Sequence, residues 1–186
     1  MKPLTGVISE AFLLVVLLAA SRTVPPGVLF GLYVVVVQLL STYLIHCPAH
    51  YVVGTIGGIK FREIRLGRTS LVQALPARLG KVASAIPILT LSTEKRTLSR
   101  ASRRRAAAMF AAGAVASTSS PLLIAAALTL TEPIAYSILA WIIAFAYLSF
   151  NVIFSPKAGD LRRAREVLKS SRQSSQSTTT SAPPTM

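Results

Sequence analysis

The chain has only two histidines, and they lie four residues apart in "LIHCPAHYVV" as His46 and His50. On a helix, this spacing places both rings on one face, about one turn apart, where they can hold one metal ion. A second interpretation is open at this point, because histidines at a membrane interface also hydrogen-bond to headgroups or to the backbone. The surrounding residues must decide between these two roles.

The histidine pair follows an apolar run that is typical of a membrane protein. Of the 186 residues, 52% are hydrophobic, and the mean hydropathy is +0.58. Long apolar stretches in such a composition indicate transmembrane helices rather than a soluble domain. The single cysteine, Cys47, excludes an internal disulfide framework, and zinc-ribbon spacing is absent.

Four segments are long and apolar enough to span a bilayer, and we expect an all-α integral membrane protein whose membrane domain covers residues 1–161. The turn between the third and fourth segments is very short, and a Pro-Pro-Gly break separates the first two, so each pair is expected to be antiparallel. The first segment could instead be a cleaved signal peptide, but Glu10 within its apolar run argues against cleavage. The expected spans are residues 4–20, 27–50, 106–130 and 134–154.

The basic residues predict the orientation of these spans. The net charge is +14. Residues 55–108 and 155–186 hold nearly all of the lysines and arginines, and only Arg22 falls in a predicted outer turn. By the positive-inside rule, both termini and the central loop are cytoplasmic in this multi-pass arrangement. Arg103-Arg104-Arg105, directly before the third span, are expected to reach anionic lipid headgroups. No aromatic-rich RNA module or helix-turn-helix pattern supports nucleic-acid binding.

The central loop, residues 55–105, carries a predicted β-hairpin. Residues 59–66 alternate between apolar and charged side chains with one slip at Glu63, which indicates a short strand at the membrane surface. Residues 86–91, "IPILTL", are a possible partner strand, and two glycines before the first strand supply a turn. Residues 170–186 are polar and of low complexity, and we expect a disordered tail there.

Pro48 is predicted to bend the second span, and Pro121 is in a setting that would allow a kink in the third. Pro48 lies between the two histidines, where it removes a helix hydrogen bond. Pro121 follows Ser117-Thr118-Ser119-Ser120 in the middle of the third span. Hydroxyl groups beside a proline can satisfy freed carbonyls and permit a kink.

The segment "HCPAHYVVGTIGGIKFREIRLG" resembles the signature of site-2 proteases, which are intramembrane zinc metalloproteases. Their H-E-x-x-H motif lies on a transmembrane helix and is followed by a glycine, a basic residue and an "REI-L" strand. His46 and His50 match the two histidine ligands of that motif, and residues 58–67 match the strand. The resemblance covers roughly residues 27–67 and 134–161.

The third zinc ligand of that family is an aspartate in a later N-x-x-P…D-G motif. In "NVIFSPKAGDL", Asp160 is the matching residue, although the glycine here precedes the aspartate and the spacing is one residue longer. The resemblance therefore implies a zinc site formed by His46, His50 and Asp160. The predicted topology agrees, because the second and fourth spans both end on the cytoplasmic side. Asp160 could also be a helix cap or a partner for Arg162 or Arg163.

The chain departs from the family at the residue that follows the first histidine. The family has a glutamate there, which acts as the general base on zinc-bound water, and this chain has Cys47. The departure implies that peptide hydrolysis by the family's mechanism is lost. Cys47 could be a further soft ligand or a small apolar filler. Glu10 could face His46 from the first span and replace the base, or it could be neutral and bonded to Ser9 or another hydroxyl.

Three hypotheses follow. The first is a non-proteolytic relative of site-2 proteases, a pseudoenzyme that holds zinc and binds another transmembrane segment. The second is an active metallohydrolase with a displaced base such as Glu10. The third is a membrane scaffold whose basic loop docks on anionic lipid, nucleic acid or a cytoplasmic partner.

Overall fold

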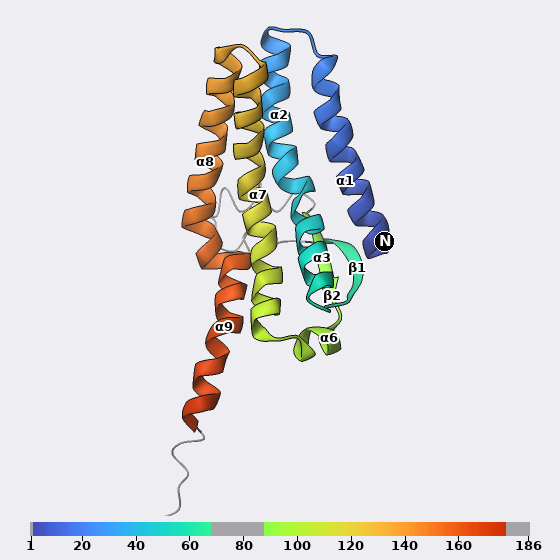
Figure 1. Ribbon diagram of the computed structural model, residues 1–186, viewed down its shortest axis with the longest axis vertical. Helices are drawn as coiled ribbons and strands as arrows, with labels where there is room; N and C mark the ends of the chain where they lie inside the picture. Colours follow the sequence, from blue (N-terminus) through green and yellow to red (C-terminus); the bar gives the residue numbers. More distant parts are fainter. Residues whose placement is uncertain (1, 68–87, 178–186) are drawn as a thin grey trace, which may run out of the picture.

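The four apolar runs form four long helices that lie side by side along the longest axis of the molecule (Figure 1). The computed structural model describes residues 2–67 and 88–177. The helices of these ranges are α1 (Pro3–Ala19), the short 3-10 helix η1 (Ala20–Arg22), α2 (Val28–Leu44), α3 (His46–Ile56), α6 (Lys95–Arg100), α7 (Arg103–Thr131), α8 (Ile134–Ala158) and α9 (Asp160–Ser177). The strands are β1 (Phe61–Gly67) and β2 (Ile88–Thr93).

Four helical stretches are long and apolar enough to cross a membrane, as the sequence predicts. Large apolar side chains point outward along them; on α1, for example, Phe12 is 68% exposed and Val15 is 64% exposed. An apolar surface around such helices is typical of a membrane span. The four stretches are Pro3–Arg22, Val28–Ile56, Arg103–Thr131 and Ile134–Lys169. Each begins within a few residues of the expected span, whereas the second ends six residues later than expected and the last continues into α9.

The apolar core lies between α2, α7 and α8. Phe30 and Val34 of α2 pack against Ala125 of α7 and against Ala140 and Ala144 of α8. The three alanines have no exposed surface, and their small side chains let the helix backbones approach closely. This packing fixes the two long helical hairpins against each other.

Pro48 interrupts the second span, as predicted. A proline lacks the N–H that would bond to the carbonyl four residues earlier, which here is that of Leu44. The helix α2 ends at Leu44, and α3 begins at His46. The break at Ile45 therefore lies at the site of the missing hydrogen bond, and it puts both histidines on a separate short helix.

By contrast, α7 runs as one helix from Arg103 through Pro121 to Thr131. The Ser117 hydroxyl donates to the Gly113 carbonyl at 2.8 Å, and the Thr118 hydroxyl donates to the Ala114 carbonyl at 2.7 Å. These hydroxyls bond to carbonyls in the preceding turn. The carbonyl that the proline leaves free is that of Ser117 itself.

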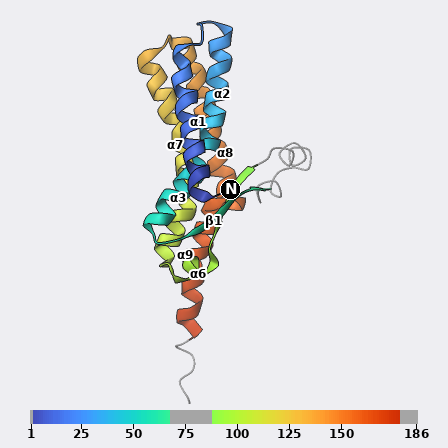
Figure 2. The same ribbon diagram turned by 90° about the vertical axis from the view of Figure 1, so that its right-hand side faces the viewer.

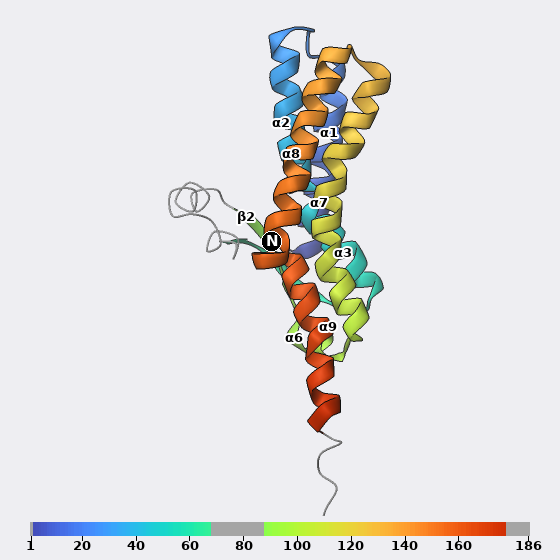
Figure 3. The ribbon, with the colours of Figure 1, turned by 90° about the vertical axis from the view of Figure 1, so that its left-hand side faces the viewer.

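The predicted hairpin is present as an antiparallel pair of β1 and β2. A register shift between Phe61 and Glu63 coincides with the slip in the alternating pattern. Gly58 has a φ of +78°, which supplies the turn before β1. The α1–α2 and α7–α8 connections lie at one end of the bundle. The hairpin lies toward the other end and projects to one side (Figures 2 and 3). Residues 86 and 87, at the start of the expected second strand, lie outside the described residues.

The C-terminal segment differs from the prediction. The helix α9 continues to Ser177, although we expected a disordered tail from residue 170. Its first turns are joined by an ion pair of 2.7 Å between Arg162 and Glu166, one helical turn apart. A polar, serine-rich composition alone does not exclude such a helix. The rest of the expected tail, residues 178–186, lies outside the described residues.

Candidate metal centre

The two histidines lie in the first turns of α3 and face α7 and α9. Their Nε2 atoms are 3.2 Å apart. His50 is buried, whereas His46 keeps 33% of its side-chain surface exposed. The helical spacing therefore brings both rings to one point, as the sequence predicts.

Asp160, the first residue of α9, joins the pair. Its Oδ2 atom is 3.1 Å from Nε2 of His46 and 3.2 Å from Nε2 of His50. The carboxylate thus contacts both rings, while the expected alternative partner Arg162 pairs with Glu166. Three potential metal ligands from two distant segments converge here, and their ligand atoms all lie within 4.8 Å of one another.

The separations among these three atoms fit a zinc ion. A tetrahedral ion with bonds of about 2.0–2.1 Å separates its ligand atoms by about 3.3–3.4 Å. The observed distances are 3.1 and 3.2 Å. Small adjustments of the side chains would let His46, His50 and Asp160 hold one such ion.

The Nδ1 atoms of His46 and His50 also have hydrogen-bond partners. The Ser117 hydroxyl lies 2.8 Å from His46 Nδ1 and 2.8 Å from the Gly113 carbonyl oxygen; when it donates to that carbonyl, it accepts from His46 Nδ1. The Nδ1 atom of His50 lies 2.6 Å from the carbonyl oxygen of Met109, which only accepts. In a neutral imidazole, a proton on Nδ1 leaves a lone pair on Nε2. Ser117 and Met109 thus orient the rings as outer partners do in known metal sites.

This proton arrangement concentrates negative charge density at one point. With neutral rings, both Nε2 lone pairs and the Asp160 carboxylate face one another at close range. Such groups repel unless a proton or a cation lies between them. The arrangement therefore has the donor chemistry of a cation site.

Gly113 of α7 leaves the space that the His50 ring occupies. A Cβ atom built on Gly113 would overlap the ring atoms Nε2, Cδ2 and Cε1 of His50. Any side chain at this position would displace the ring. The close approach of α3 to α7 thus depends on a glycine whose role the sequence alone does not indicate.

A cavity of about 500 Å³ opens beside the three residues. Its volume is in the usual range for a ligand pocket. Strand β2 lines it through Thr90, Leu91 and Thr93, and α8 lines it through Tyr147 and Phe150. The hairpin and the metal candidates therefore share one space.

Cys47 is buried and lines the same cavity, but it is not part of the cluster of His46, His50 and Asp160. It forms no disulfide, since it is the only cysteine. Of the two roles considered for it, the position agrees with a small filler rather than with a ligand.

Glu10 is buried in α1 and lies outside the described lining of the cavity. Both of its carboxylate oxygens lack a hydrogen-bond partner among the described residues. The Ser9 hydroxyl donates to the Thr5 carbonyl instead. The alternative bond between Glu10 and Ser9 is thus not formed. Glu10 is not part of the cluster of His46, His50 and Asp160, but it lies close enough to Cys47, the neighbour of His46, to interact with it electrostatically.

Arg103, Arg104 and Arg105 form the exposed first turn of α7, which Ser102 caps by accepting a hydrogen bond from the Arg105 N–H. Their contact with anionic headgroups stays a prediction.

Comparison with protein-family models, with curated proteins and with solved structures gave no match to this chain. The likeness to site-2 proteases therefore depends on the residues of the two motifs alone.

Proposed function

We propose that this chain is a multi-pass membrane protein that holds a zinc ion between His46, His50 and Asp160 and binds a segment of another membrane protein beside it without cutting that segment. The convergence of three ligand atoms, with both outer ring nitrogens already bonded, is the observation that carries the proposal. Zinc suits two imidazoles and one carboxylate with an open fourth position.

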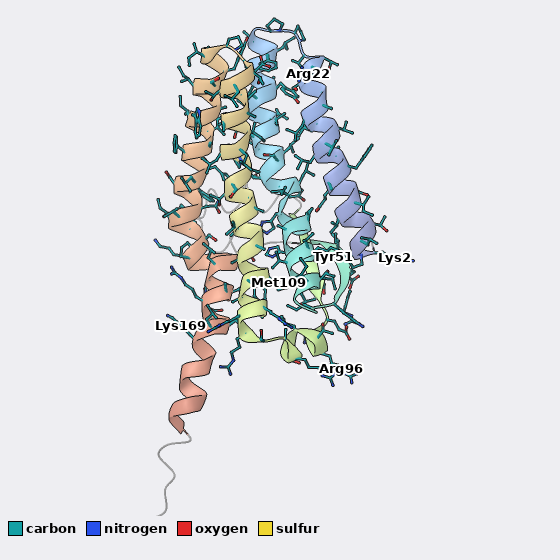
Figure 4. The ribbon with its side chains drawn as sticks, viewed as in Figure 1. Lys2, Arg22, Tyr51, Arg96, Met109 and Lys169 are labelled. Carbon is teal, nitrogen blue, oxygen red and sulfur yellow. The ribbon has the colours of Figure 1, made fainter. Side chains whose placement is uncertain are left out.

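The proposed depth of the site is the inner end of the bilayer. His46 follows Val28 by 18 residues, or about 27 Å of helix, and the hydrocarbon core is about 30 Å thick. Figure 4 shows Arg22 at one end of the bundle and Lys2, Arg96 and Lys169 toward the other half. We propose by the positive-inside rule that this second half is cytoplasmic. Reporter fusions at Glu94 and at the C-terminus should then both read cytoplasmic, and an external reading at either site would refute this topology.

The absence of a second carboxylate from the cavity supports binding without cleavage. All six acidic residues of the chain lie in the described ranges, and Asp160 is the only one that lines the cavity. A metalloprotease of this type needs a carboxylate base besides its zinc ligands. Cys47, at the family's base position, supplies none.

The walls of the cavity suit a polypeptide segment. Phe61, Leu91 and Phe150 offer apolar contacts, and Asn151 and Thr93 offer hydrogen-bonding groups. A transmembrane segment that enters between α8 and the hairpin would reach the exposed side of His46. The mixed lining fits the side chains and the backbone of such a segment.

Metal analysis tests the proposal directly. Protein purified with a tag that contains no histidine should carry about one zinc per chain, and the His46→Ala, His50→Ala double variant should carry less than a tenth of that. Cys47→Ser is the matched control, because it alters the same cavity without removing a ligand, and it should keep its zinc. Wild-type protein that stays metal-free after incubation with zinc would overturn the proposal.

A second candidate function is a metallohydrolase in which Glu10 acts as the base. It is favoured by one observation, that Glu10 is 4% exposed and its oxygens are unpartnered among the described residues. A buried carboxyl in such a position is costly and often functional. Turnover of a membrane substrate would separate this candidate from the first.

A third candidate is a scaffold that uses its basic face alone. Exposed arginines at the start of α7 and on α9 would then dock on anionic lipid or on an acidic cytoplasmic partner. This function needs no metal, so normal partner binding by the metal-free double variant would favour it.

A further inference from the structure

A second cavity, of about 620 Å³, lies at the opposite end of the molecule from the histidines. Its walls come from α1, α2 and α7, and they are mainly apolar, with Leu18, Val37, Leu123 and Leu128 among them. The helices α1 and α7 lie on either side of α2 at this end (Figure 1). We call this space the upper cleft.

Two charged residues from separate turns line the upper cleft. Arg22 comes from the turn between α1 and α2, and Glu132 comes from the turn between α7 and α8. Arg22 is the only Lys, Arg, Asp or Glu within residues 11–59, and Glu132 is the only one within residues 106–156. The two charges of this end of the molecule are thus placed in one cavity.

Neither charge is neutralised by the other. The ion pairs among residues 2–67 and 88–177 involve the histidines, Asp160, Arg162 and Glu166. The side chains of Arg22 and Glu132 form no hydrogen bond or ion pair with the described residues. Both remain available to a ligand.

The position of Glu132 favours a cationic partner. It is the C-cap residue of α7, a helix of 29 residues, and the C-terminal end of a helix carries a partial negative charge. A glutamate there adds to that charge instead of offsetting it. A positively charged group bound at this point would interact favourably with both the carboxylate and the helix end.

We propose that the upper cleft binds a zwitterionic phospholipid. The lipid phosphate lies at the Arg22 guanidinium, its ammonium group lies at Glu132, and one acyl chain fills the apolar space between α1 and α7. Ser21 and Thr131 also line the cleft, and the Thr131 hydroxyl donates to the Ala127 carbonyl. Phosphatidylglycerol, an anionic lipid, would satisfy Arg22 with its phosphate but would bring only a neutral glycerol group, and no cation, to Glu132.

Native mass spectrometry of the purified chain, exchanged into micelles with equal amounts of phosphatidylethanolamine and phosphatidylglycerol, tests this site. Wild type should retain phosphatidylethanolamine about three- to fivefold more than phosphatidylglycerol, the usual scale of an exposed ion pair. Glu132→Gln should remove that preference, and Arg22→Gln should weaken retention of both lipids. Glu166→Gln and Arg96→Gln, at the other end of the molecule, are matched controls and should behave as wild type.

A filling variant tests the acyl-chain position. Ala127 lines the upper cleft on an exposed face of α7, so Ala127→Phe should occupy the cleft and release either lipid. Equal retention of both lipids by wild type, or an unchanged preference in Glu132→Gln, would overturn the proposal. Because these readouts involve no metal, they are independent of the zinc site. If Ala127→Phe folds poorly, Glu132→Gln and Arg22→Gln still test the proposed lipid site.

Discussion

Asp160 and Glu10 are both largely buried carboxylates, and they differ in the hydrogen-bond partners that surround them. Asp160 contacts two imidazoles, and those rings are oriented in turn by Ser117 and by the Met109 carbonyl. Glu10 lies in α1 with both oxygens unpartnered among the described residues. One region contains three potential ligands with their supporting partners, whereas the other contains one acid that lies close enough to Cys47 to interact with it electrostatically but has no hydrogen-bond partner among the described residues.

The difference shows that burial of a carboxylate does not by itself define a site. A functional side chain needs neighbouring groups that hold it in one orientation, and several helices must pack together to supply those groups. At Asp160, α3, α7 and α9 supply those partners. Glu10 has no hydrogen-bond partner among the described residues, so the metal that we propose would belong to the first region.

The same chemical change at both acids should give opposite results, and it has the largest expected effect. Asp160→Asn removes the anionic ligand and should reduce bound zinc to less than a tenth of an equivalent. Glu10→Gln should leave zinc at about one equivalent, because Glu10 contributes no ligand. Zinc content by atomic emission after dialysis measures both. Loss of zinc in Glu10→Gln, or its retention in Asp160→Asn, would reverse our assignment.

Gly113→Ala should come next in size, because its methyl group would overlap the His50 ring. We expect a loss of about 100-fold in zinc affinity, as for displacement of an essential partner. Competition with a fluorescent chelator measures this affinity. Gly31→Ala is the control, since a Cβ there would meet only a side-chain atom of Leu139 at 3.9 Å, and it should bind zinc normally.

Ser117→Ala should have a smaller effect, because the ligands stay and only the orientation of His46 is released. Loss of an outer partner typically lowers metal affinity about 10–100-fold. Thr118→Ala removes a hydroxyl that makes the same kind of bond in the next position of α7 but does not contact a histidine. Equal zinc affinities of the two variants would show that the Ser117 bond does not support the site.

The smallest expected effect is on proteolysis, because we expect the wild type to have no measurable proteolytic activity. A general base contributes about 10²–10⁴-fold, and Cys47 cannot supply it. Wild type and Glu10→Gln should both leave single-span membrane peptides uncut, and Cys47→Glu tests whether the remaining site can be restored. Robust cleavage by wild type that disappears in Glu10→Gln would contradict the non-proteolytic hypothesis and would favour an active metallohydrolase with Glu10 as its base.

Local patterns in the sequence predict much of this architecture. The four apolar runs, the break caused by Pro48 and the strand with its slip at Glu63 depend on neighbouring residues, and all appear in the structure. Asp160 was a candidate through the resemblance to the family motif, and counting the spans placed it at the same depth as the histidines, because an even number of crossings returns the chain to the same side. Neither argument alone required their contact.

The supporting groups were not predicted, for a physical reason. Ser117, Gly113 and the Met109 carbonyl belong to α7, some 60 to 70 residues from the histidines, and their roles depend on how α7 is rotated toward α3. An apolar helix in lipid has no strong periodicity to fix that rotation. The hydroxyl run before Pro121 was visible, but its sequence indicated a kink and gave no sign of contact with a histidine.

The long separation between the ligands has a consequence for the time course of synthesis. His50 and Asp160 are 110 residues apart, which a ribosome adding about 5–20 residues per second translates in roughly 6–22 s. During that interval the first helical hairpin carries two histidines and no third ligand. The zinc site that we propose could therefore be completed only late in the life of the nascent chain, after the second hairpin has been made.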